Sequence, residues 1–396
     1  MAQLLCISGD SHVVEPAEVF NGLEARFGEA APKVVHDPER GDVLVVNGRP
    51  GLSVGRLGIA GHYVNDPATQ EMIRKGYAGM RPGVMDPIAR LKDQEIDGID
   101  AEVIYPSVMF GVYPIPNAEI VAATFRNYND WTANYCSQAP NRLFPLACIP
   151  LHDVDAAIAE LRRAVKLGHR GACIPCVPPK DRPYSDRSYD PFWEVAQELK
   201  TPLLMHIFTT AAPNHGLPDW GPITNYALAH TGMAAVISDL ICGGVCARYP
   251  GLRFVPTEWE TGWVAHFLQR LDWALHRSPS AAAPEVTERP SEYFHRNFIV
   301  TFEDDRTGIL TRNEIGVRNL MWGSDYPHHD SIFPRSQEVL DEIFDGVPEE
   351  DRYRITAANC CELYNLPFVL RTSAPDCHHP RRRDQRMVRG LPASAR

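Results

Sequence analysis

The 396-residue sequence has no uninterrupted run of about 18 apolar residues, the length that a membrane-spanning helix requires. Its beginning, Met1–Leu4, also lacks a basic segment followed by a long apolar run, which is the pattern of a secretory leader. These two absences argue against a membrane protein and against a secreted one. We therefore expect a cytoplasmic protein with no membrane partner.

Positive charge is scarce as well. Lys and Arg number 39 against 50 Asp and Glu, a formal net charge of −11, whereas nucleic-acid binding needs a clustered basic face. The arginine-rich stretch Arg381–Arg383 lies in a C-terminal segment with few apolar residues. We expect no nucleic-acid partner, and we interpret residues 367–396 as a disordered tail, with a docking arm as the alternative.

The ten cysteines lack the spacing of a disulfide framework or of a zinc site. Cys6, Cys148, Cys173 and Cys176 lie in apolar strand-like runs, where a free cysteine behaves as a small hydrophobic residue. Cys173 and Cys176 form a C-x-x-C motif, but no second C-x-x-C accompanies it. The pattern favours reduced cysteines, as in a reducing compartment.

What the sequence does contain is a repeated alternation of strand and helix patterns, with 44% hydrophobic residues to form a large core. A helical pattern such as Ala156–Leu167 has apolar residues at i, i+3 and i+4 and ends at Gly168. Further helices are expected at Tyr226–Arg248, Trp263–His276 and Ser336–Phe344, and helix starts at Asp153 and Asp190. The apolar strand-like segments are Leu4–Gly9, Ala101–Tyr105, Leu143–Ile149, Gly171–Cys176, Pro202–Met205, Leu252–Thr257, Phe298–Phe302 and Asn319–Gly323.

Strands that alternate with helices predict parallel βαβ units, and eight such units favour a closed (β/α)8 TIM-type barrel of the α/β class. An open doubly wound sheet would more often carry a Gly-rich phosphate turn after the first strand, which this sequence lacks. We expect one domain over residues 1–366. Within it, residues of about 21–90 form an insertion with a hairpin at Asn47-Gly48, and a loop this long usually is a lid or a substrate wall.

Polar residues follow most of the predicted strands. Active sites of such barrels lie at the carboxyl ends of the strands, so these side chains are expected to meet at one mouth. Imidazole nitrogens and carboxylate oxygens are good ligands for divalent metals, and their convergence predicts a metal site. The residues at the strand ends are Asp10, His12, Ser107, His152, His206, Glu258, Glu303, Asp304, Asp325, His328 and His329.

This pattern resembles the amidohydrolase-related family, the branch of the amidohydrolase superfamily that includes aminocarboxymuconate-semialdehyde and γ-resorcylate decarboxylases. The resemblance covers residues from about 5 to 366 and rests on Asp10–Pro16, His206, Glu258–Trp263 and Gly323–His328. It implies a (β/α)8 barrel and a homodimer. It also implies metal ligands at His12, His206 and Asp325, with Asp325 handling a proton as well.

Two positions depart from the pattern of that family. Asp10 takes the place where relatives carry His or Glu. Decarboxylase relatives usually have a histidine after strand six and a carboxylate three residues later, whereas this sequence has Glu258 and Thr261, with Glu260 displaced by one. The departures leave hydrolysis and decarboxylation both open.

A metal held by Asp10, His12, His206, Glu258 and Asp325 would lower the pKa of bound water to ~7. With Asp325 as the base, this predicts hydrolysis of a carbonyl compound. The same metal could instead chelate a hydroxybenzoate or related acid for loss of CO₂. Zn, Mn or Fe would suit these ligands.

The mouth has more carboxylates than a hydrolase needs, and carboxylates can bridge two metals. A non-haem di-iron oxygenase, with two Fe and a hydroxylase activity, is therefore the alternative to hydrolysis or decarboxylation. Its second metal, or the outer contacts of a single one, would involve Glu303, Asp304, His328 and His329. A barrel whose metal site has decayed to a binding module is a further alternative.

Other residues are candidates for the substrate side of the site. His230 lies on or near a helix and is interpreted either as a second catalytic residue or as an ordinary surface or core histidine. Aromatic side chains around the mouth predict a medium-sized cyclic or aromatic substrate with a polar group, although ordinary loop packing would need the same residues. The pocket candidates are Phe110, Tyr113, Phe208 and Trp259.

Overall fold

Residues 5–370 are described by a computed structural model. Among them, no helix combines the length and the apolar character that crossing a bilayer would require. The predicted disordered tail lies outside the described residues from position 371 onward.

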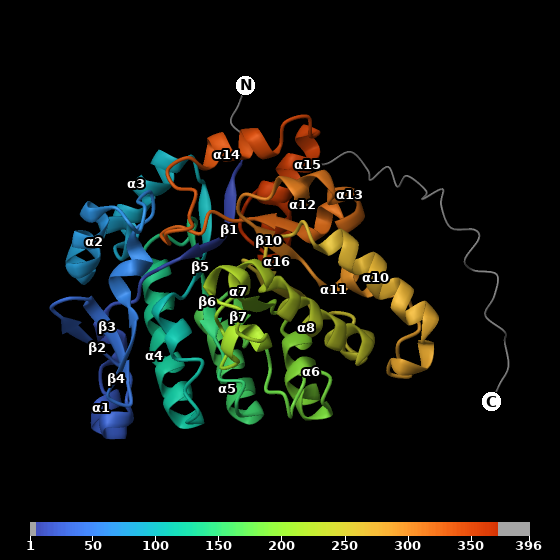
Figure 1. The fold of residues 1–396 in the computed structure, drawn as a ribbon, viewed down its shortest axis with the longest axis horizontal. Helices are drawn as coiled ribbons and strands as arrows, with labels where there is room; N and C mark the ends of the chain where they lie inside the picture. Colours follow the sequence, from blue (N-terminus) through green and yellow to red (C-terminus); the bar gives the residue numbers. More distant parts are fainter. Residues whose placement is uncertain (1–4, 371–396) are drawn as a thin grey trace.

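Eight parallel strands form the centre of the molecule, and Figure 1 shows the helices arranged around them. Six strands make one continuous sheet, in the order β1-β5-β6-β7-β8-β9, and β10 pairs with β11. Their bounds are β1 (Ile7–His12), β5 (Ala101–Tyr105), β6 (Leu143–Cys148), β7 (Gly171–Cys173), β8 (Leu203–His206), β9 (Phe254–Thr257), β10 (Val300–Phe302) and β11 (Leu320–Trp322).

Two junctions join the six-stranded sheet to the β10–β11 pair and so close the ring of strands. A parallel bridge joins Phe254 of β9 to Phe298, just before β10. On the other side, the backbone N–H groups of Ser324 and Asp325 donate to the carbonyl of Asp10, at 3.1 and 3.0 Å, so the end of β11 meets β1. The predicted (β/α)8 TIM-type barrel is thereby confirmed.

The junction between β11 and β1 is unusually close, and glycine permits it. A Cβ on Gly323 would lie 2.3 Å from the Cβ of Asp10, and a Cβ on Gly9 would lie 2.6 Å from the Met321 side chain. A side chain at position 323 would collide with Asp10, including its backbone, and one at position 9 would displace the Met321 side chain. The close approach carries the residues after β11 directly over the polar end of β1.

The helices mostly follow the predicted periodicity. α5 begins after Asp153, whose side chain accepts the N–H of Ala156, and it ends at Gly168 with φ 100°. The prediction of a single helix at Tyr226–Arg248 is wrong, because three successive helices cover that range. Gly244, at φ 82°, separates the third of them from the second. The helices are α1 (Leu23–Phe27), α2 (Pro67–Arg74), α3 (Pro87–Asp97), α4 (Ala118–Ser137), α5 (Val154–Leu167), α6 (Asp190–Glu198), α7 (Pro222–Leu228), α8 (His230–Cys242), α9 (Val245–Arg248), α10 (Val264–Arg277), α11 (Pro290–Asn297), α12 (Arg306–Leu310), α13 (Arg312–Ile315), α14 (Ser336–Ile343), α15 (Glu349–Tyr353) and α16 (Asn359–Tyr364).

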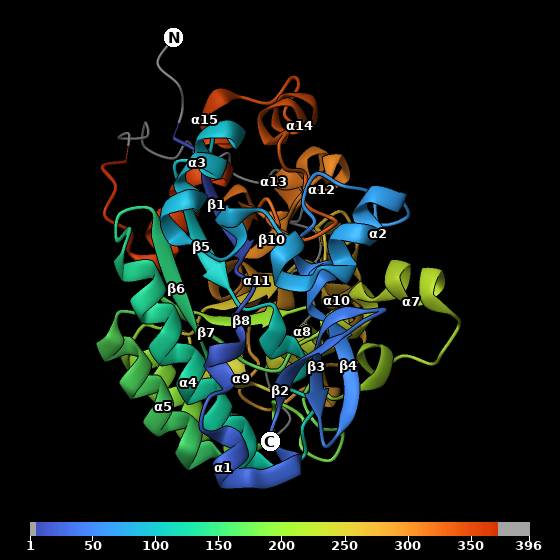
Figure 2. The ribbon, with the colours of Figure 1, turned by 90° about the vertical axis from the view of Figure 1, so that its left-hand side faces the viewer.

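The insertion between β1 and β5 contains an antiparallel sheet of β2 (Lys33–Asp37), β3 (Gly41–Val46) and β4 (Arg49–Ser53). Its β3–β4 hairpin turns at Asn47 and Gly48, both with positive φ, as the Asn-Gly pair predicts. In Figure 1 the insertion is blue and lies on the left, and Figure 2 turns that side towards the viewer.

The insertion packs against the loop that follows β5. A Cβ on Gly111 would lie 2.5 Å from the Leu44 side chain of β3, and the N–H of Ala60 donates to Pro327, in the segment after β11. The insertion therefore supports two of the segments that leave the carboxyl ends of the strands, which suits a wall of the mouth.

His169, just after α5, should make the protein less stable in acid. Burial lowers its pKa to about 4, assisted by the charge of Arg163 and opposed by the hydrogen bond to Ala164. An unfolded chain binds a proton at an ordinary histidine pKa near 6.5, so the unfolded state gains this proton first as the pH falls. We expect the stability advantage of wild type over His169→Gln to shrink by about 2 kcal/mol between pH 7 and pH 5, in urea unfolding. Parallel stability profiles of the two proteins would contradict this.

Candidate metal centre

Five of the predicted site residues meet at the carboxyl end of the barrel. Asp10 and His12 belong to β1 itself, which runs further than the predicted strand Leu4–Gly9. His206 is the last residue of β8, Glu258 follows β9 and Asp325 follows β11. Asp10, His12, His206 and Asp325 are buried, and the side chain of Glu258 is 10% exposed.

The imidazole rings of His12 and His206 are nearly perpendicular, at 87°, and their Nε2 atoms come close together. The Nε2 atoms of His12 and His206 are 3.1 Å apart, and His206 Nε2 lies 3.1 Å from a carboxylate oxygen of Glu258. Asp10 Oδ1 lies 3.4 Å from His12 Nε2 and 3.6 Å from His206 Nε2, and Asp325 Oδ1 lies 3.3 Å from His12 Nε2. Ligand atoms of Asp10, His12, His206 and Glu258 thus lie within 4.8 Å of one another, and Asp325 adjoins this group at His12.

The contacts of the Nδ1 atom of each ring show which ring nitrogen can bind a cation. His12 Nδ1 is 2.7 Å from the carbonyl of Pro106, and His206 Nδ1 is 2.8 Å from the carbonyl of Ile207. A carbonyl can only accept, so both Nδ1 atoms carry the proton and the neutral rings present lone pairs at Nε2. Two lone pairs 3.1 Å apart among carboxylates require a positive charge between them, either a proton on His206 or a metal cation.

The carboxylates support the metal. All four carboxylate oxygens of Asp10 and Asp325 are buried without a hydrogen-bond partner within residues 5–370. Buried polar atoms normally have partners, so unpaired carboxylate oxygens beside two imidazole nitrogens are a donor set that fits a bound cation. Asp10, His12, His206 and Glu258 have ligand atoms close enough to share an ion, and so do His12, Glu258, Asp325 and His328. Nitrogen and oxygen donors of this kind fit a divalent transition metal.

Burial and neighbouring negative charges disfavour the charged forms of two acids of the site. Burial raises the pKa of Asp325 well above its usual range, and Glu258 and Asp10 add to the effect. Burial and the charge of Asp325 likewise raise the pKa of Glu303. Burial opposes protonation of His206, but Glu258 and Asp10 outweigh it and raise its pKa. A divalent cation would relieve this repulsion, because it becomes the largest charge of the site.

The backbone around the site is strained. Phe208, Glu258, Glu260 and Asp325 all have positive φ, between 51° and 70°. Each such residue costs about 1–3 kcal/mol and persists only where the surroundings hold it, which is typical of active sites. These sharp turns follow β8, β9 and β11, and they direct the polar side chains into the mouth.

A chain of contacts joins Asp325 to the loop after β5. The imidazole Nδ1 of His328 lies 2.8 Å from Asp325 Oδ1, outside hydrogen-bonding direction, and its Nε2 lies 2.9 Å from the hydroxyl of Ser107. Glu15 accepts the N–H groups of Ser107, Val108 and Met109, at 2.7–3.2 Å. Sequence reasoning gave Glu15 no role. Its position three residues after His12 was the only hint in the sequence that it lies near the site.

Of the four remaining predicted ligands, two are buried and two are exposed. Glu303 is buried and interacts electrostatically with Asp325 and Glu258, and His328 belongs to the second ligand group. Asp304 and His329 are exposed, and His329 pairs with Asp330 at 3.2 Å. Neither of these two lies in a ligand group among the described residues.

His230 is placed apart from the ligand groups. It is the first residue of α8, and its ring centre lies 5.5 Å from that of Trp263. This packing against the indole agrees with the interpretation of His230 as an ordinary half-buried histidine. Its predicted catalytic role stays a prediction.

The aromatic candidates take different places. Phe110 lies against the site, with its ring centre 4.7 Å from His206 and 5.7 Å from His12. The rings of Phe208 and Trp259 both contact His215, a residue that sequence reasoning missed, at 5.5 and 5.1 Å. Tyr113 packs in the core instead, because its hydroxyl bonds the carbonyl of Cys173 and its ring contacts Phe125.

Comparison with known proteins gives a consistent result. A family model described as amidohydrolase matches residues 66–366. The γ-resorcylate decarboxylase of Rhodococcus jostii is 30% identical over 276 residues, which cover 64% of this chain and 80% of that protein.

Solved structures share the fold. An amidohydrolase from Mycobacterium avium subsp. paratuberculosis superposes with a TM-score of 0.74 at 21% identity, covering 92% of this chain and all of that one. A dihydroxybenzoic acid decarboxylase from Polaromonas sp. JS666, solved with manganese and the inhibitor 2-nitroresorcinol, superposes with a TM-score of 0.63 at 19% identity. The superposition covers 93% of this chain and 98% of the Polaromonas chain.

Proposed function

The chain belongs to the amidohydrolase family, and on this premise we propose that it is a metal-dependent enzyme that decarboxylates an aromatic carboxylic acid without oxidation. The observation that carries the proposal is the buried point where the lone pairs of His12 and His206 meet the unpartnered carboxylates of Asp10 and Asp325. The similarity to γ-resorcylate decarboxylase favours decarboxylation over hydrolysis.

Asp10, His12, His206, Glu258 and Asp325 would hold the metal. Manganese is the proposed ion, because the Polaromonas decarboxylase was solved with it. When bound, the ion supplies a Lewis acid that binds the oxygens of the acid and stabilises developing negative charge.

The residues of the chain supply the proton and the shape. We propose that Asp325 donates a proton to the ring carbon that bears the carboxylate. The bond from that carbon to the carboxyl carbon then breaks, CO₂ leaves, and the electron pair of the bond restores the aromatic ring. The donated proton stays on the product, so Asp325 needs a new proton after each turnover, and His328, beside Asp325 and held by Ser107, is the neighbouring group that would relay it. Phe110 would pack against the substrate ring near His206.

The di-iron oxygenase remains the second candidate, supported by one observation. The two ligand groups overlap, and each contains His12 and Glu258. Two adjacent cations would share Glu258, because a carboxylate has two oxygens and can bridge, and a mixed set of histidines and carboxylates suits iron.

Metal analysis combined with a substrate assay tests the proposal. We expect one manganese per chain and CO₂ release from γ-resorcylate or another hydroxybenzoate, without consumption of O₂. Two irons per chain with O₂ uptake would favour the oxygenase. Hydrolysis of esters or amides without CO₂ release from any hydroxybenzoate would favour the hydrolase.

The organisation of the chain adds two proposals. We propose that residues 1–366 act as one catalytic domain, because the insertion packs against the loop that carries Ser107 and Phe110. We also propose a homodimer, to be tested by light scattering of the purified protein.

A further inference from the structure

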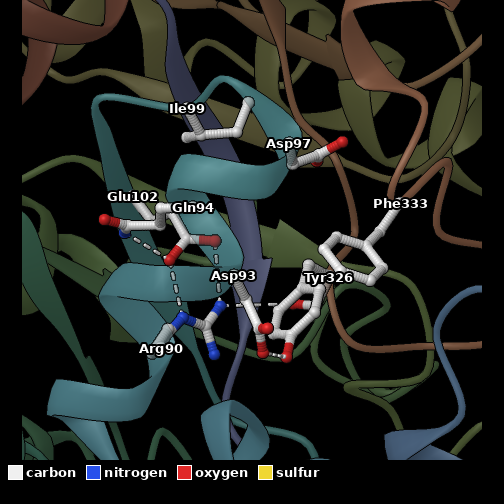
Figure 3. Close-up of a pocket in the computed structure, with 8 residues that line it drawn as sticks. All are labelled: Arg90, Asp93, Gln94, Asp97, Ile99, Glu102, Tyr326 and Phe333. Atoms are coloured by element: carbon white, nitrogen blue, oxygen red, sulfur yellow. Dashed lines mark hydrogen bonds and ion pairs between the residues drawn. The ribbon is translucent and has the colours of Figure 1, made fainter.

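A buried arginine lies behind the barrel wall, on the inner face of α3. Arg90 is fully buried and pairs with Glu102 of β5 through two contacts, Nε to Oε2 at 2.6 Å and Nη2 to Oε1 at 3.0 Å. Gln94, one turn along α3, donates to the same carboxylate at 2.6 Å. Figure 3 shows these side chains around a small pocket between α3 and the strands.

The guanidinium also reaches two backbone carbonyls of the metal centre. Nη1 donates to the carbonyl of His12 at 2.5 Å, and Nη2 donates to the carbonyl of Tyr326 at 3.4 Å. The N–H of His12 itself donates to the Tyr326 carbonyl at 2.6 Å. Arg90 therefore joins the strand that carries Asp10 and His12 to the residue directly after Asp325.

Tyr326 is held by its side chain as well. The guanidinium carbon of Arg90 lies 4.7 Å from the centre of its ring, and its hydroxyl donates to Asp93 at 2.5 Å. Arg81 pairs with the other oxygen of Asp93, also at 2.5 Å. One face of α3 thus fixes both the backbone and the ring of the residue next to Asp325, whose own φ of 52° requires such support.

Stability alone explains this arrangement poorly. Burying a charged pair costs desolvation energy that its attraction often only balances, so apolar residues would hold α3 to the barrel about as well. Apolar residues would not, however, supply N–H groups to the carbonyls of His12 and Tyr326. The planar fork of arginine serves Glu102 and both carbonyls at once, which a lysine cannot do.

We propose that Arg90 is a positioning residue for the metal centre, setting the placement of His12 and Asp325 through their backbone. This inference rests on the proposed metal site. Arg90 has no exposed surface, so it acts on the chemistry only through the ligands. In metalloproteins, residues that hydrogen-bond to the metal ligands orient those ligands. Replacement of such a residue typically weakens metal binding 10–100-fold, and Arg90 would act in the same way.

The variant Arg90→Lys tests the proposal, because it keeps the charge and removes the fork. We expect Mn²⁺ to bind about 10–100-fold more weakly and the electron paramagnetic resonance spectrum of bound Mn²⁺ to change. The matched control is Arg248→Lys. Arg248 is a largely buried arginine that pairs with Asp190 and donates to the carbonyl of Gly243. In the control, affinity and spectrum should stay those of wild type.

The outcomes separate the two hypotheses. Wild-type affinity and spectrum in folded Arg90→Lys would overturn the positioning role, even if its melting temperature fell. Failure of the wild-type protein to bind Mn²⁺ at all would instead overturn the proposed function. If Arg90→Lys does not fold, Glu102→Gln decides, because it weakens the partner that orients Arg90. Altered Mn²⁺ affinity and spectrum would support the proposal, and unchanged values would overturn it.

Discussion

Asp325→Asn is expected to fold and to lose about 10²–10⁴-fold in kcat. Asparagine has the shape of aspartate and can keep the buried position after β11, but it has no acidic proton to give to a substrate carbon. It also removes a carboxyl group whose charged form is disfavoured by burial and by the charges of Glu258 and Asp10. The variant should therefore be at least as stable as wild type without metal. CO₂ release at saturating Mn²⁺ measures the loss.

Asp304→Asn is the matched control for this experiment. Asp304 is an exposed acid on the loop after β10, outside both ligand groups of the described residues. Its replacement makes the same chemical change on the same side of the barrel, and kcat should stay within twofold of wild type. Equal losses in both variants would show a general electrostatic effect, and full activity of Asp325→Asn would exclude Asp325 as the proton donor.

The residues that gather at the mouth of the barrel could be predicted from sequence because two regularities act together. An apolar run marks each strand, and parallel strands in a barrel bring their carboxyl ends to one mouth. These rules placed Asp10, His206 and Asp325 among the residues at the mouth, and the family resemblance then singled out His12, His206 and Asp325 as ligands. The rules do not resolve neighbouring residues, and so His328 and exposed His329 were equally good candidates until the turn after Asp325 separated them.

Other features depend on contacts between distant segments, which carry no local signal. Glu15 accepts backbone N–H groups more than 90 residues away, and Arg90 bonds a carbonyl 236 residues away. Tyr113 was expected in the pocket because it follows a strand, but its hydroxyl finds a partner in the core. In these cases tertiary packing decided what the sequence pattern left open. The helix break at Gly244 is different, because two successive glycines are a local signal that outweighed the apolar periodicity.

Removal of the metal should abolish activity and lower the stability of the protein together. An ion that binds only the folded state adds about 4 kcal/mol when its free concentration is 1,000 times its Kd. It also offsets the repulsion between the buried carboxylates of Asp10 and Asp325, which lack hydrogen-bond partners within residues 5–370. We expect EDTA to remove CO₂ release completely and to lower the melting temperature, and Mn²⁺ to restore both.

His206→Ala shows whether this effect belongs to the proposed centre. The variant lacks the Nε2 atom that faces both His12 and Glu258, so it should bind Mn²⁺ too weakly to be stabilised. Its melting temperature should then be the same with EDTA and with Mn²⁺, whereas His329→Ala, which changes an exposed histidine, should respond as wild type does. An equal response of His206→Ala and wild type to EDTA would place the stabilising ion elsewhere in the protein. A response lost only in His206→Ala would tie activity and stability to the same buried ligands.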